Sequence, residues 1–415
     1  MKKLIILLAV LAFSTANAQQ KHVLFLGNSY TGVNNLPLLI KSVAISFGDT
    51  LVTEANTPGG YQLVQHTTNA TTLTKINSRN WDFVILQEQS QKPSFSPAQV
   101  ATDVYPYAYQ LNNTIKANHS CTETVFYMTW GRKNSDPGPC ANGLTSSCSY
   151  EGMQQRLRES YMHMADSNNA TVSPVGVAWE TVRDSFPLIE LYSPDESHPS
   201  IRGSYLAACV FYATLYQKSP IGSTYLPVGV TNSEALYLQT IASNTVLDSL
   251  SLWGINTNNP IADFNYSGDT TINFTNTSTN GTSYFWNFGD GNTSTLQNPN
   301  HTYTTGGNYT VQLTTFSNDS CHSSVSIQNI IITTTQIEET KNSKNLIIFP
   351  NPANNFIEIK TDLDYSSVSI MDVTGKTIKH VISQNRIDIS DLTNGIYFIK
   401  ITGKENTVIR KFVKE

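Results

Sequence analysis

The sequence predicts a multidomain protein with an α/β domain first and two all-β modules after it. Up to residue 254, short apolar runs alternate with longer helical patterns, which indicates a parallel sheet with helices on both faces. Beyond that point the chain is rich in Thr, Asn and Ser and alternates between apolar and polar residues. No Lys or Arg occurs between Lys218 and Lys341, whereas the last 80 residues carry eleven, so the two β modules differ in surface charge.

Length and composition agree with this organisation. At roughly 150 residues per domain, the 415 residues suggest two to four domains. A hydrophobic content of 39% and a charged content of 14% suit an extracellular, strand-rich protein. The formal net charge is −5, so the chain has no general basic field, and nucleic acid is excluded as a leading partner.

The first 18 residues have the pattern of a signal peptide. Lys2 and Lys3 precede the apolar run Leu4–Phe13, and Ala16-Asn17-Ala18 offers the small residues that a signal peptidase accepts. We therefore expect cleavage before Gln19 and export of the chain. The alternative is an N-terminal membrane anchor, but the apolar run is about half as long as a bilayer span, so no transmembrane segment is predicted.

Residues 19–254 form the predicted α/β domain. Its expected strands lie near Val23–Leu26, Phe83–Leu86, Val125–Met128 and Val172–Val177, and its expected helices near Leu36–Phe47, Pro97–Ala117 and Tyr150–Asp166. A closing helix should begin at a capping box made by Thr231 and Glu234 and run to Trp253, where Gly254 stops it. Residues 255–335 predict a β-sandwich, 336–345 a polar linker, and 346–415 a second all-β module.

The chain has five cysteines, so an exported protein must leave one unpaired. Cys140 and Cys148 bracket a short loop and are the expected disulfide. Cys209 lies in an apolar helical stretch and should be buried, while Cys121 and Cys321 stay unassigned. The spacings match no zinc pattern, so no metal is expected.

The loop after the first strand is the best candidate for a nucleophile. Gly27-Asn28-Ser29 could present the Ser29 hydroxyl at the sheet edge, near the start of a helix. A serine there needs a base, and Asp195 precedes His198 by three residues, so the carboxylate could hold one imidazole nitrogen. This spacing arises often by chance. The alternative is a surface histidine beside a helix cap.

Four blocks in this order resemble the SGNH/GDSL hydrolases: Gly27-Asn28-Ser29, Gly59-Gly60, Gln87-Glu88-Gln89-Ser90 and Asp195 with His198. The resemblance implies a flavodoxin-like three-layer fold and a cofactor-free esterase. In it Ser29 would attack an acyl carbon, His198 would transfer the proton and Asp195 would orient the imidazole. The alternative is a degenerate, non-catalytic relative.

The resemblance also implies an oxyanion hole made by the Ser29 and Gly60 amides and one side-chain amide. Two departures from the family pattern bear on it. The usual Gly-Asp-Ser is Gly-Asn-Ser here, and the usual Gly-x-Asn-Asp is replaced by Gln87-x-Gln89-Ser90. Gln89 is the expected donor and Gln87 the reserve.

Three further residues are candidates for contact with substrate. Gln87 is one of them. His66 could line the cleft or be a structural histidine on a helix. Trp130 follows a strand and could stack on a sugar ring or pack in the core.

The second region carries Trp286-Asn287-Phe288-Gly289-Asp290-Gly291 and, further on, Gly307-Asn308-Tyr309-Thr310-Val311, which together look like a PKD domain. This resemblance implies an immunoglobulin-like sandwich with Trp286 inside. A spacer role is favoured over binding of glycan or Ca²⁺.

The last region carries Ile348-Phe349-Pro350-Asn351-Pro352, Asp372-Val373-Thr374-Gly375-Lys376 and Asn394-Gly395-Ile396-Tyr397-Phe398. It is similar to the C-terminal sorting domain of the type IX secretion system, which implies recognition by that machinery and a secreted or surface location in a Bacteroidota-type bacterium. An ordinary β module used for binding is the alternative.

The sequence therefore predicts a secreted serine esterase that removes acetyl or other short acyl groups from polysaccharide. Two alternatives stay open: a lipid or aryl esterase, and a non-catalytic glycan-binding surface protein.

Overall fold

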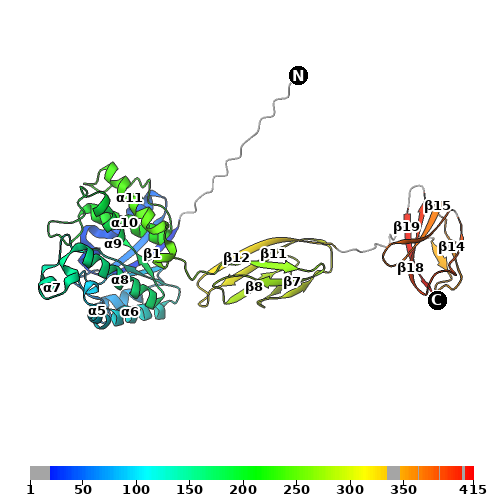
Figure 1. Cartoon of the computed structure of the whole chain (residues 1–415), viewed down its shortest axis with the longest axis horizontal. Coiled ribbons are helices and arrows are strands. Elements are labelled where there is room, and N and C mark those ends of the chain that lie inside the picture. Colours follow the sequence, from blue (N-terminus) through cyan, green and yellow to red (C-terminus); the bar gives the residue numbers. More distant parts are fainter. Residues whose placement is uncertain (1–18, 334–345, 363, 383, 404–406) are drawn as a thin grey trace, which may run out of the picture. The chain divides into compact units, whose positions relative to one another are not determined.

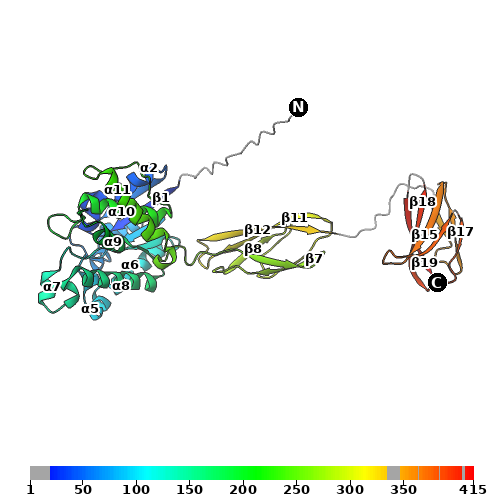
Figure 2. The ribbon, with the colours of Figure 1, turned by 45° about the horizontal axis from the view of Figure 1, so that its top comes forward.

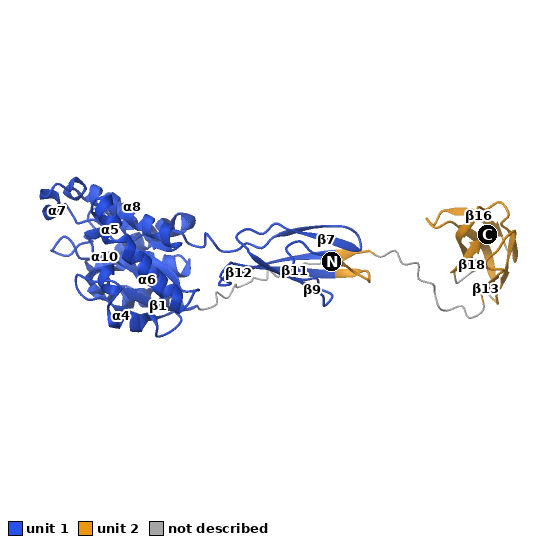
Figure 3. Cartoon of the chain, turned by 90° about the horizontal axis from the view of Figure 1, so that it is seen from below, with its two compact units in different colours: residues 1–301, 309–330 blue, residues 302–308, 331–415 orange. Residues whose placement is uncertain are grey.

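The computed structural model of the chain describes residues 19–333, 346–362, 364–382, 384–403 and 407–415. The expected signal peptide (1–18) and linker (336–345) lie outside these residues. The chain divides into two compact units, coloured separately in Figure 3. The first comprises the residues up to His301 and Tyr309–Ile330, and the second comprises Thr302–Asn308 and Ile331–Glu415.

The N-terminal domain is built on a five-stranded parallel sheet with the strand order β2-β1-β3-β4-β5. The strands are β1 (Gln20–Leu26), β2 (Thr50–Asn56), β3 (Phe83–Leu86), β4 (Glu123–Tyr127) and β5 (Thr171–Ser173). Because the order reverses at β1, with β2 on one side and β3 on the other, the carboxyl ends of β1 and β3 form the edge where ligands bind in such sheets. This confirms the predicted three-layer α/β class with flavodoxin-like strand order.

Helices cover both faces of this sheet, as Figure 1 shows. They are α1 (Ser29–Gly32), α2 (Leu36–Ser46), α3 (Leu63–His66), α4 (Ala70–Ile76), α5 (Pro97–Asp103), α6 (Tyr105–Asn118), α7 (Pro137–Ala141), α8 (Tyr150–Asn168), α9 (Val175–Ser185), α10 (Ile201–Tyr216) and α11 (Asn232–Leu247). Short 3₁₀ turns occupy Val33–Asn35, Lys92–Ser94, Thr145–Cys148 and Leu250–Trp253. Helix α10 packs against α2, α9 and α11, which explains why nearly all of its side chains are buried.

Three expected elements differ in detail. The run Val172–Val177 is a strand only to Ser173, because Pro174 caps α9 and the valines that follow begin that helix. The helix expected over Pro97–Ala117 is two helices that meet at Val104, since Pro106 in the first turn of α6 has no amide hydrogen to continue a preceding helix. The closing helix has its Thr231–Glu234 capping box but ends at Leu247, before a 3₁₀ turn.

The next module contains two antiparallel sheets with the orders β10-β7-β6 and β12-β11-β8-β9. Figure 2 labels β7 of the first sheet and β8, β11 and β12 of the second. Its strands are β6 (Phe264–Ser267), β7 (Thr271–Asn276), β8 (Ser283–Asn287), β9 (Thr293–Ser294), β10 (Asn300–Thr302), β11 (Gly307–Phe316) and β12 (Ser323–Ile332). The side chains of Phe264, Phe274 and Trp286 pack as an aromatic cluster between the sheets, and Trp286 is fully buried as predicted.

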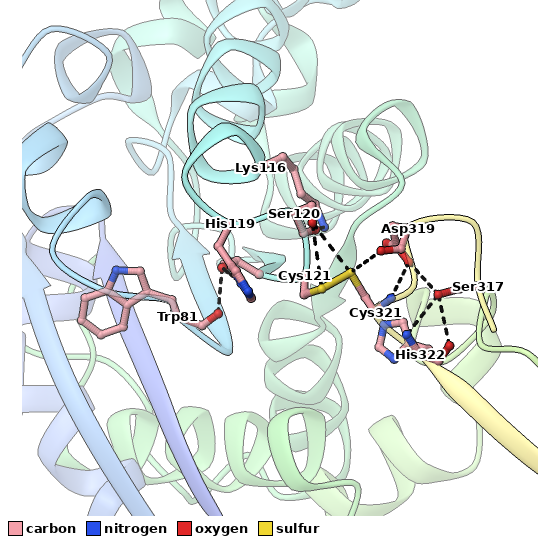
Figure 4. Close-up of a disulfide and its surroundings, with 10 residues drawn as sticks. Trp81, Lys116, His119, Ser120, Cys121, Ser317, Asp319, Cys321 and His322 are labelled. Carbon is pink, nitrogen blue, oxygen red and sulfur yellow. Dashed lines mark hydrogen bonds between the residues drawn. A yellow bond between two sulfur atoms is a disulfide. The ribbon is translucent and has the colours of Figure 1, made fainter.

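A disulfide between Cys121 and Cys321 crosslinks the α/β domain to this sandwich (Figure 4). Cys121 lies just before β4, and Cys321 lies in the turn between β11 and β12. A cavity of about 720 Å³ adjoins the crosslink, and its lining includes Phe83 and Glu123 at the amino ends of β3 and β4. This cavity is therefore at the opposite edge of the sheet from Ser29.

The other cysteines behave as predicted. Cys140 and Cys148 form a disulfide across the α7 loop, and Cys209 is unpaired and buried in α10. No helix in the part of the chain that the structure describes has the length and apolar character that a bilayer span requires.

The C-terminal module is an all-β unit with its own hydrophobic core. It holds sheets of order β13-β14-β17 and β16-β15-β18-β19. Its strands are β13 (Ile347–Phe349), β14 (Phe356–Lys360), β15 (Tyr365–Met371), β16 (Thr377–Ile382), β17 (Arg386–Asp388), β18 (Gly395–Gly403) and β19 (Thr407–Lys414).

Candidate active site

Ser29 is the first residue of α1, immediately after the turn that ends β1. Asn28 caps this short helix, and its side-chain oxygen accepts a hydrogen bond from the Tyr30 amide at 3.1 Å. Gly27 is required in the turn, since a Cβ there would lie 2.6 Å from Oε1 of Gln87. Ser29 itself is only half-buried, so its hydroxyl faces the open edge of the sheet.

The structure brings the three predicted catalytic side chains together, although 169 positions separate Ser29 from His198. The Ser29 Oγ lies 2.8 Å from Nε2 of His198, and Nδ1 of His198 lies 2.5 Å from Oδ2 of Asp195. With Asp195 ionised, the Nδ1 proton is donated to the carboxylate. The free Nε2 lone pair then accepts a hydrogen bond from the Ser29 hydroxyl, which is the geometry for taking its proton.

Asp195 is held in this orientation by its own loop. Its other oxygen, Oδ1, accepts hydrogen bonds from the amides of Ser197 at 3.1 Å and His198 at 3.0 Å. Partial burial acts to raise the pKa of Asp195, but the hydrogen bonds from the His198 ring and these two amides outweigh it and lower the pKa below its ordinary value. Asp195 is therefore ionised at neutral pH.

The segment before His198 is fixed by aromatic residues. The Tyr30 hydroxyl lies 2.6 Å from the Ser197 hydroxyl, and the Trp130 indole donates to the Ser197 carbonyl at 3.1 Å. The Tyr30 ring lies 5.2 Å from the His198 ring. The residue after the candidate nucleophile thus helps to set the position of the candidate base.

The amides expected to bind an oxyanion are available. The backbone N–H groups of Ser29 and Gly60 have no hydrogen-bond partner among the described residues. Gly60 has a φ of +72°, a conformation that favours glycine. Gln89 is turned toward its own loop: its Nε2 donates to Gln91 at 3.2 Å, and its Oε1 accepts from the Gln91 amide at 2.8 Å. No contact joins Gln89 to Ser29, so donation from Gln89 would require its side chain to turn.

Gln87 does not line the cleft. Its side chain is completely buried, and its Nε2 donates to Oδ1 of Asn28 at 3.0 Å. Its Oε1 accepts from the Asn28 amide at 2.9 Å and from the Thr31 hydroxyl at 3.0 Å. The expectation that Gln87 meets the substrate or serves as a reserve oxyanion donor is corrected, because these bonds occupy both ends of its amide.

His66 and Trp130 are also corrected as substrate contacts, because neither has exposed surface. Nε2 of His66 donates to the Gly27 carbonyl at 2.9 Å, and burial lowers the pKa of His66, so the ring is neutral. Trp130 stacks on Trp179 with 3.8 Å between ring centroids and on Tyr30 with 5.0 Å. Both faces of its indole are covered, which leaves none for a sugar.

Sequence reasoning missed Glu88, a completely buried carboxylate beside the site. Its side chain accepts from the Gln89 amide at 2.5 Å and from the Leu63 amide at 3.2 Å. Burial raises the pKa of Glu88 to about 7, against the opposing effect of these hydrogen bonds and of the Lys92 charge. Glu88 belongs to the block Gln87-Glu88-Gln89-Ser90, but no role was predicted for it, because its burial depends on segments far away in the chain.

The strand order and the helices on both faces make the first domain a three-layer α/β domain, the fold that SGNH/GDSL hydrolases have. Ser29, His198 and Asp195 meet at the carboxyl edge of its sheet. The two β modules belong to known domain families. Residues 258–332 match the family model of the PKD domain, and residues 347–415 match that of the secretion system C-terminal sorting domain. No curated protein matches the chain.

Solved structures resemble parts of the chain. A DUF4886 family protein from Bacteroides uniformis is 18% identical with a TM-score of 0.48, covering 55% of this chain and 95% of its own. A candidate SGNH hydrolase from Slackia heliotrinireducens is 29% identical with a TM-score of 0.38, covering 48% and 100%. The PKD1 domain of a Vibrio cholerae metalloprotease is 34% identical with a TM-score of 0.18, covering 18% and 99%.

Proposed function

We propose that the chain is a secreted serine esterase whose reaction is carried by Ser29, His198 and Asp195. The observation that supports this most directly is the pair of hydrogen bonds from Ser29 Oγ to His198 Nε2 and from His198 Nδ1 to Asp195, at 2.8 and 2.5 Å. The C-terminal sorting domain indicates secretion or surface attachment in a Bacteroidota-type bacterium and implies recognition by the type IX machinery.

The reaction proceeds in two half-reactions. The Ser29 oxygen bonds to the acyl carbon while its proton passes to Nε2 of His198, and the negative charge on the carbonyl oxygen is held by the Ser29 and Gly60 amides. The intermediate collapses when the ester C–O bond breaks, and the leaving alcohol takes the proton from His198. Water then attacks the acyl-serine, gives one proton to His198, and releases the acid as Ser29 regains its proton.

We propose acetyl or another short acyl group on carbohydrate as the substrate. The surface beside His198 supports this choice, since the neighbouring loops expose charged and amide side chains. Asn134 donates to Glu196 at 3.0 Å, and Lys133 pairs with Glu190 at 2.6 Å. Such groups hydrogen-bond sugar hydroxyls, whereas a lipid substrate needs a broad apolar surface.

Hydrolysis of p-nitrophenyl acetate by wild type and Ser29→Ala tests the mechanism. We expect the variant to lose at least about 10³-fold in kcat, because the nucleophile and its partners act as a unit. Ser42→Ala is the matched control, since the Ser42 hydroxyl lies on α2 and bonds only the Leu38 carbonyl. Equal rates for wild type and Ser29→Ala would eliminate the mechanism, and equal rates no faster than the uncatalysed reaction would favour the non-catalytic glycan-binding alternative.

A substrate panel tests the specificity. Release of acetate from acetylated xylan, pectin or chitin should exceed hydrolysis of short-chain lipid esters, measured at equal ester concentration. Faster turnover of the lipid esters would replace the carbohydrate proposal with the lipid or aryl esterase alternative.

A further inference from the structure

Asn28, the residue before the candidate nucleophile, is almost completely buried with 2% of its surface exposed. Its amide group is used at both ends. The side-chain oxygen accepts from the Tyr30 amide and from Nε2 of Gln87, and the side-chain nitrogen donates to the Tyr61 carbonyl at 2.8 Å. Asn28 therefore links the Ser29 turn to the loop that carries Gly60.

Gln87 completes this link from the end of β3. Gln87 and Asn28 form a reciprocal pair, since the Gln87 oxygen accepts the Asn28 backbone N–H at 2.9 Å and the Gln87 nitrogen donates to the Asn28 side-chain oxygen at 3.0 Å. The Gln87 nitrogen also donates to the Glu88 carbonyl. The buried side-chain amides of Asn28 and Gln87 thus join the Ser29 turn, the loop that carries Gly60 and the residues that follow β3.

This arrangement needs an amide at position 28 and does not tolerate a carboxylate. An ionised aspartate has no hydrogen to donate, so one of its oxygens would face the Tyr61 carbonyl across a 2.8 Å contact with no proton between them. The charge would also be buried without a cation. The two departures from the family pattern, Gly-Asn-Ser and the glutamine at 87, therefore depend on each other, because the side chains of Asn28 and Gln87 form hydrogen bonds with each other's residue.

We propose that Asn28 and Gln87 are paired positioning residues for the reaction at Ser29, an inference that rests on the proposed function. They hold the Ser29 amide and, through the Tyr61 carbonyl, the Gly60 amide at the spacing that the oxyanion requires. Neither residue touches substrate. They act by keeping two free backbone donors aimed at one point, and donors of this kind are worth about 10² to 10³ in rate each.

Asn28→Asp tests the pair, because it restores the family motif and preserves the side-chain shape. We expect kcat on p-nitrophenyl acetate to fall about 10²-fold while KM changes less than about threefold, since only the transition state uses the two amides. The ratio of the variant's kcat/KM to that of wild type should rise as the pH is lowered. A protonated aspartic acid can again donate to Tyr61. With both proteins compared at equal folded fraction, this dependence reports the Tyr61 contact and not a loss of folded protein.

Asn35→Asp is the control. It makes the same chemical change in the 3₁₀ turn between α1 and α2, at an exposed residue whose side chain has no hydrogen-bond partner among the described residues, and its activity should match wild type. Gln87→Glu is the second variant, since in its ionised form it keeps the acceptor for the Asn28 amide, loses the donor and adds a buried charge. Wild-type kcat in Asn28→Asp and Gln87→Glu would overturn the proposal.

A second readout does not depend on activity. Hydrogen exchange of the backbone amides in residues 59–63 should be faster in Asn28→Asp than in wild type or Asn35→Asp, with all three compared at equal folded fraction. If wild type shows no Ser29-dependent hydrolysis, the proposed function fails and the positioning role fails with it, but the exchange result still decides whether Asn28 links the two loops. Faster exchange supports the link between the two loops, and unchanged exchange overturns it.

Discussion

Two carboxylates beside the candidate active site have pKa values displaced in opposite directions by their surroundings. For Asp195 the hydrogen bonds to the carboxylate prevail over partial burial and lower its pKa, which keeps it ionised as a partner for His198. For Glu88 complete burial prevails and raises its pKa to about 7. The same functional group can therefore serve one role as a permanent anion and another as a group that titrates near neutrality.

The raised pKa of Glu88 predicts a pH-dependent cost to folding. Because the folded chain holds the proton more tightly than the unfolded chain, the contribution of Glu88 to stability is fully present below about pH 4.5 and is lost as the pH rises to about 7. The loss should reach about 3 kcal/mol, since one pH unit corresponds to about 1.4 kcal/mol. The glutamine in Glu88→Gln does not titrate. The free energy of unfolding of this variant should therefore rise relative to that of wild type between about pH 4.5 and about pH 7, and the difference should stay constant at higher pH.

Denaturant unfolding of both proteins at several pH values from 4.5 to 8 measures this difference. Other ionisable groups contribute equally to both proteins and cancel. A difference between Glu88→Gln and wild type that is the same at every pH would show that Glu88 keeps an ordinary pKa.

The catalytic candidates could be proposed from sequence because their residue types and local spacing are typical of a nucleophile, a base and its carboxylate partner. Ser29 follows a strand, and Asp195 lies three residues before His198. The structural role of Gln87 could not be predicted, because it depends on burial by segments far away in the chain. For His66 and Trp130 the sequence left a buried role and a substrate contact open, and the structure supports the buried role. The same amide or indole serves as a substrate contact when exposed and as a support for the site when buried.

At the level of elements, the alternation of strand and helix was sufficient to predict the class of sheet and four of its five strands, but β2 (Thr50–Asn56) was not among the expected strands. Two of the errors fall at prolines. Pro174 ends β5 early, and Pro106 divides the predicted long helix into α5 and α6. The pairing of Cys121 with Cys321 could not be predicted, because it depends on a contact between two domains rather than on spacing. The crosslink joins the sandwich covalently to the α/β domain, and a spacer role for the sandwich stays a prediction.

The Cys121–Cys321 disulfide should contribute more to stability than the Cys140–Cys148 disulfide. Closing a loop of 200 residues removes more entropy from the unfolded chain than closing one of 8, with expected contributions of about 5 and about 2.5 kcal/mol. Replacing both cysteines of each pair by serine and measuring denaturant unfolding compares the two. An equal or larger loss for the Cys140–Cys148 variant would show that the interdomain crosslink adds little beyond the contacts around it.

At the level of the whole molecule, the C-terminal module has its own hydrophobic core, formed by residues such as Ile357, Ile370, Ile399 and Phe412. Its match to a sorting domain assigns it to export, whereas Ser29, His198 and Asp195 all lie in the first domain. Catalysis and export should therefore be separable by truncation.

We expect a chain that ends at Thr333 to keep the kcat and KM of the full-length protein on p-nitrophenyl acetate within about twofold, because it retains the α/β domain, the sandwich and the Cys121–Cys321 crosslink. In a host with type IX secretion, the same truncation should abolish appearance of the protein outside the cell, measured by immunoblot of cell and medium fractions. A full-length Ser29→Ala variant is the control, since it should be exported normally although inactive. Export of the truncated chain would contradict a sorting role for the last module, and loss of activity on truncation would mean that this module supports the hydrolase domain directly.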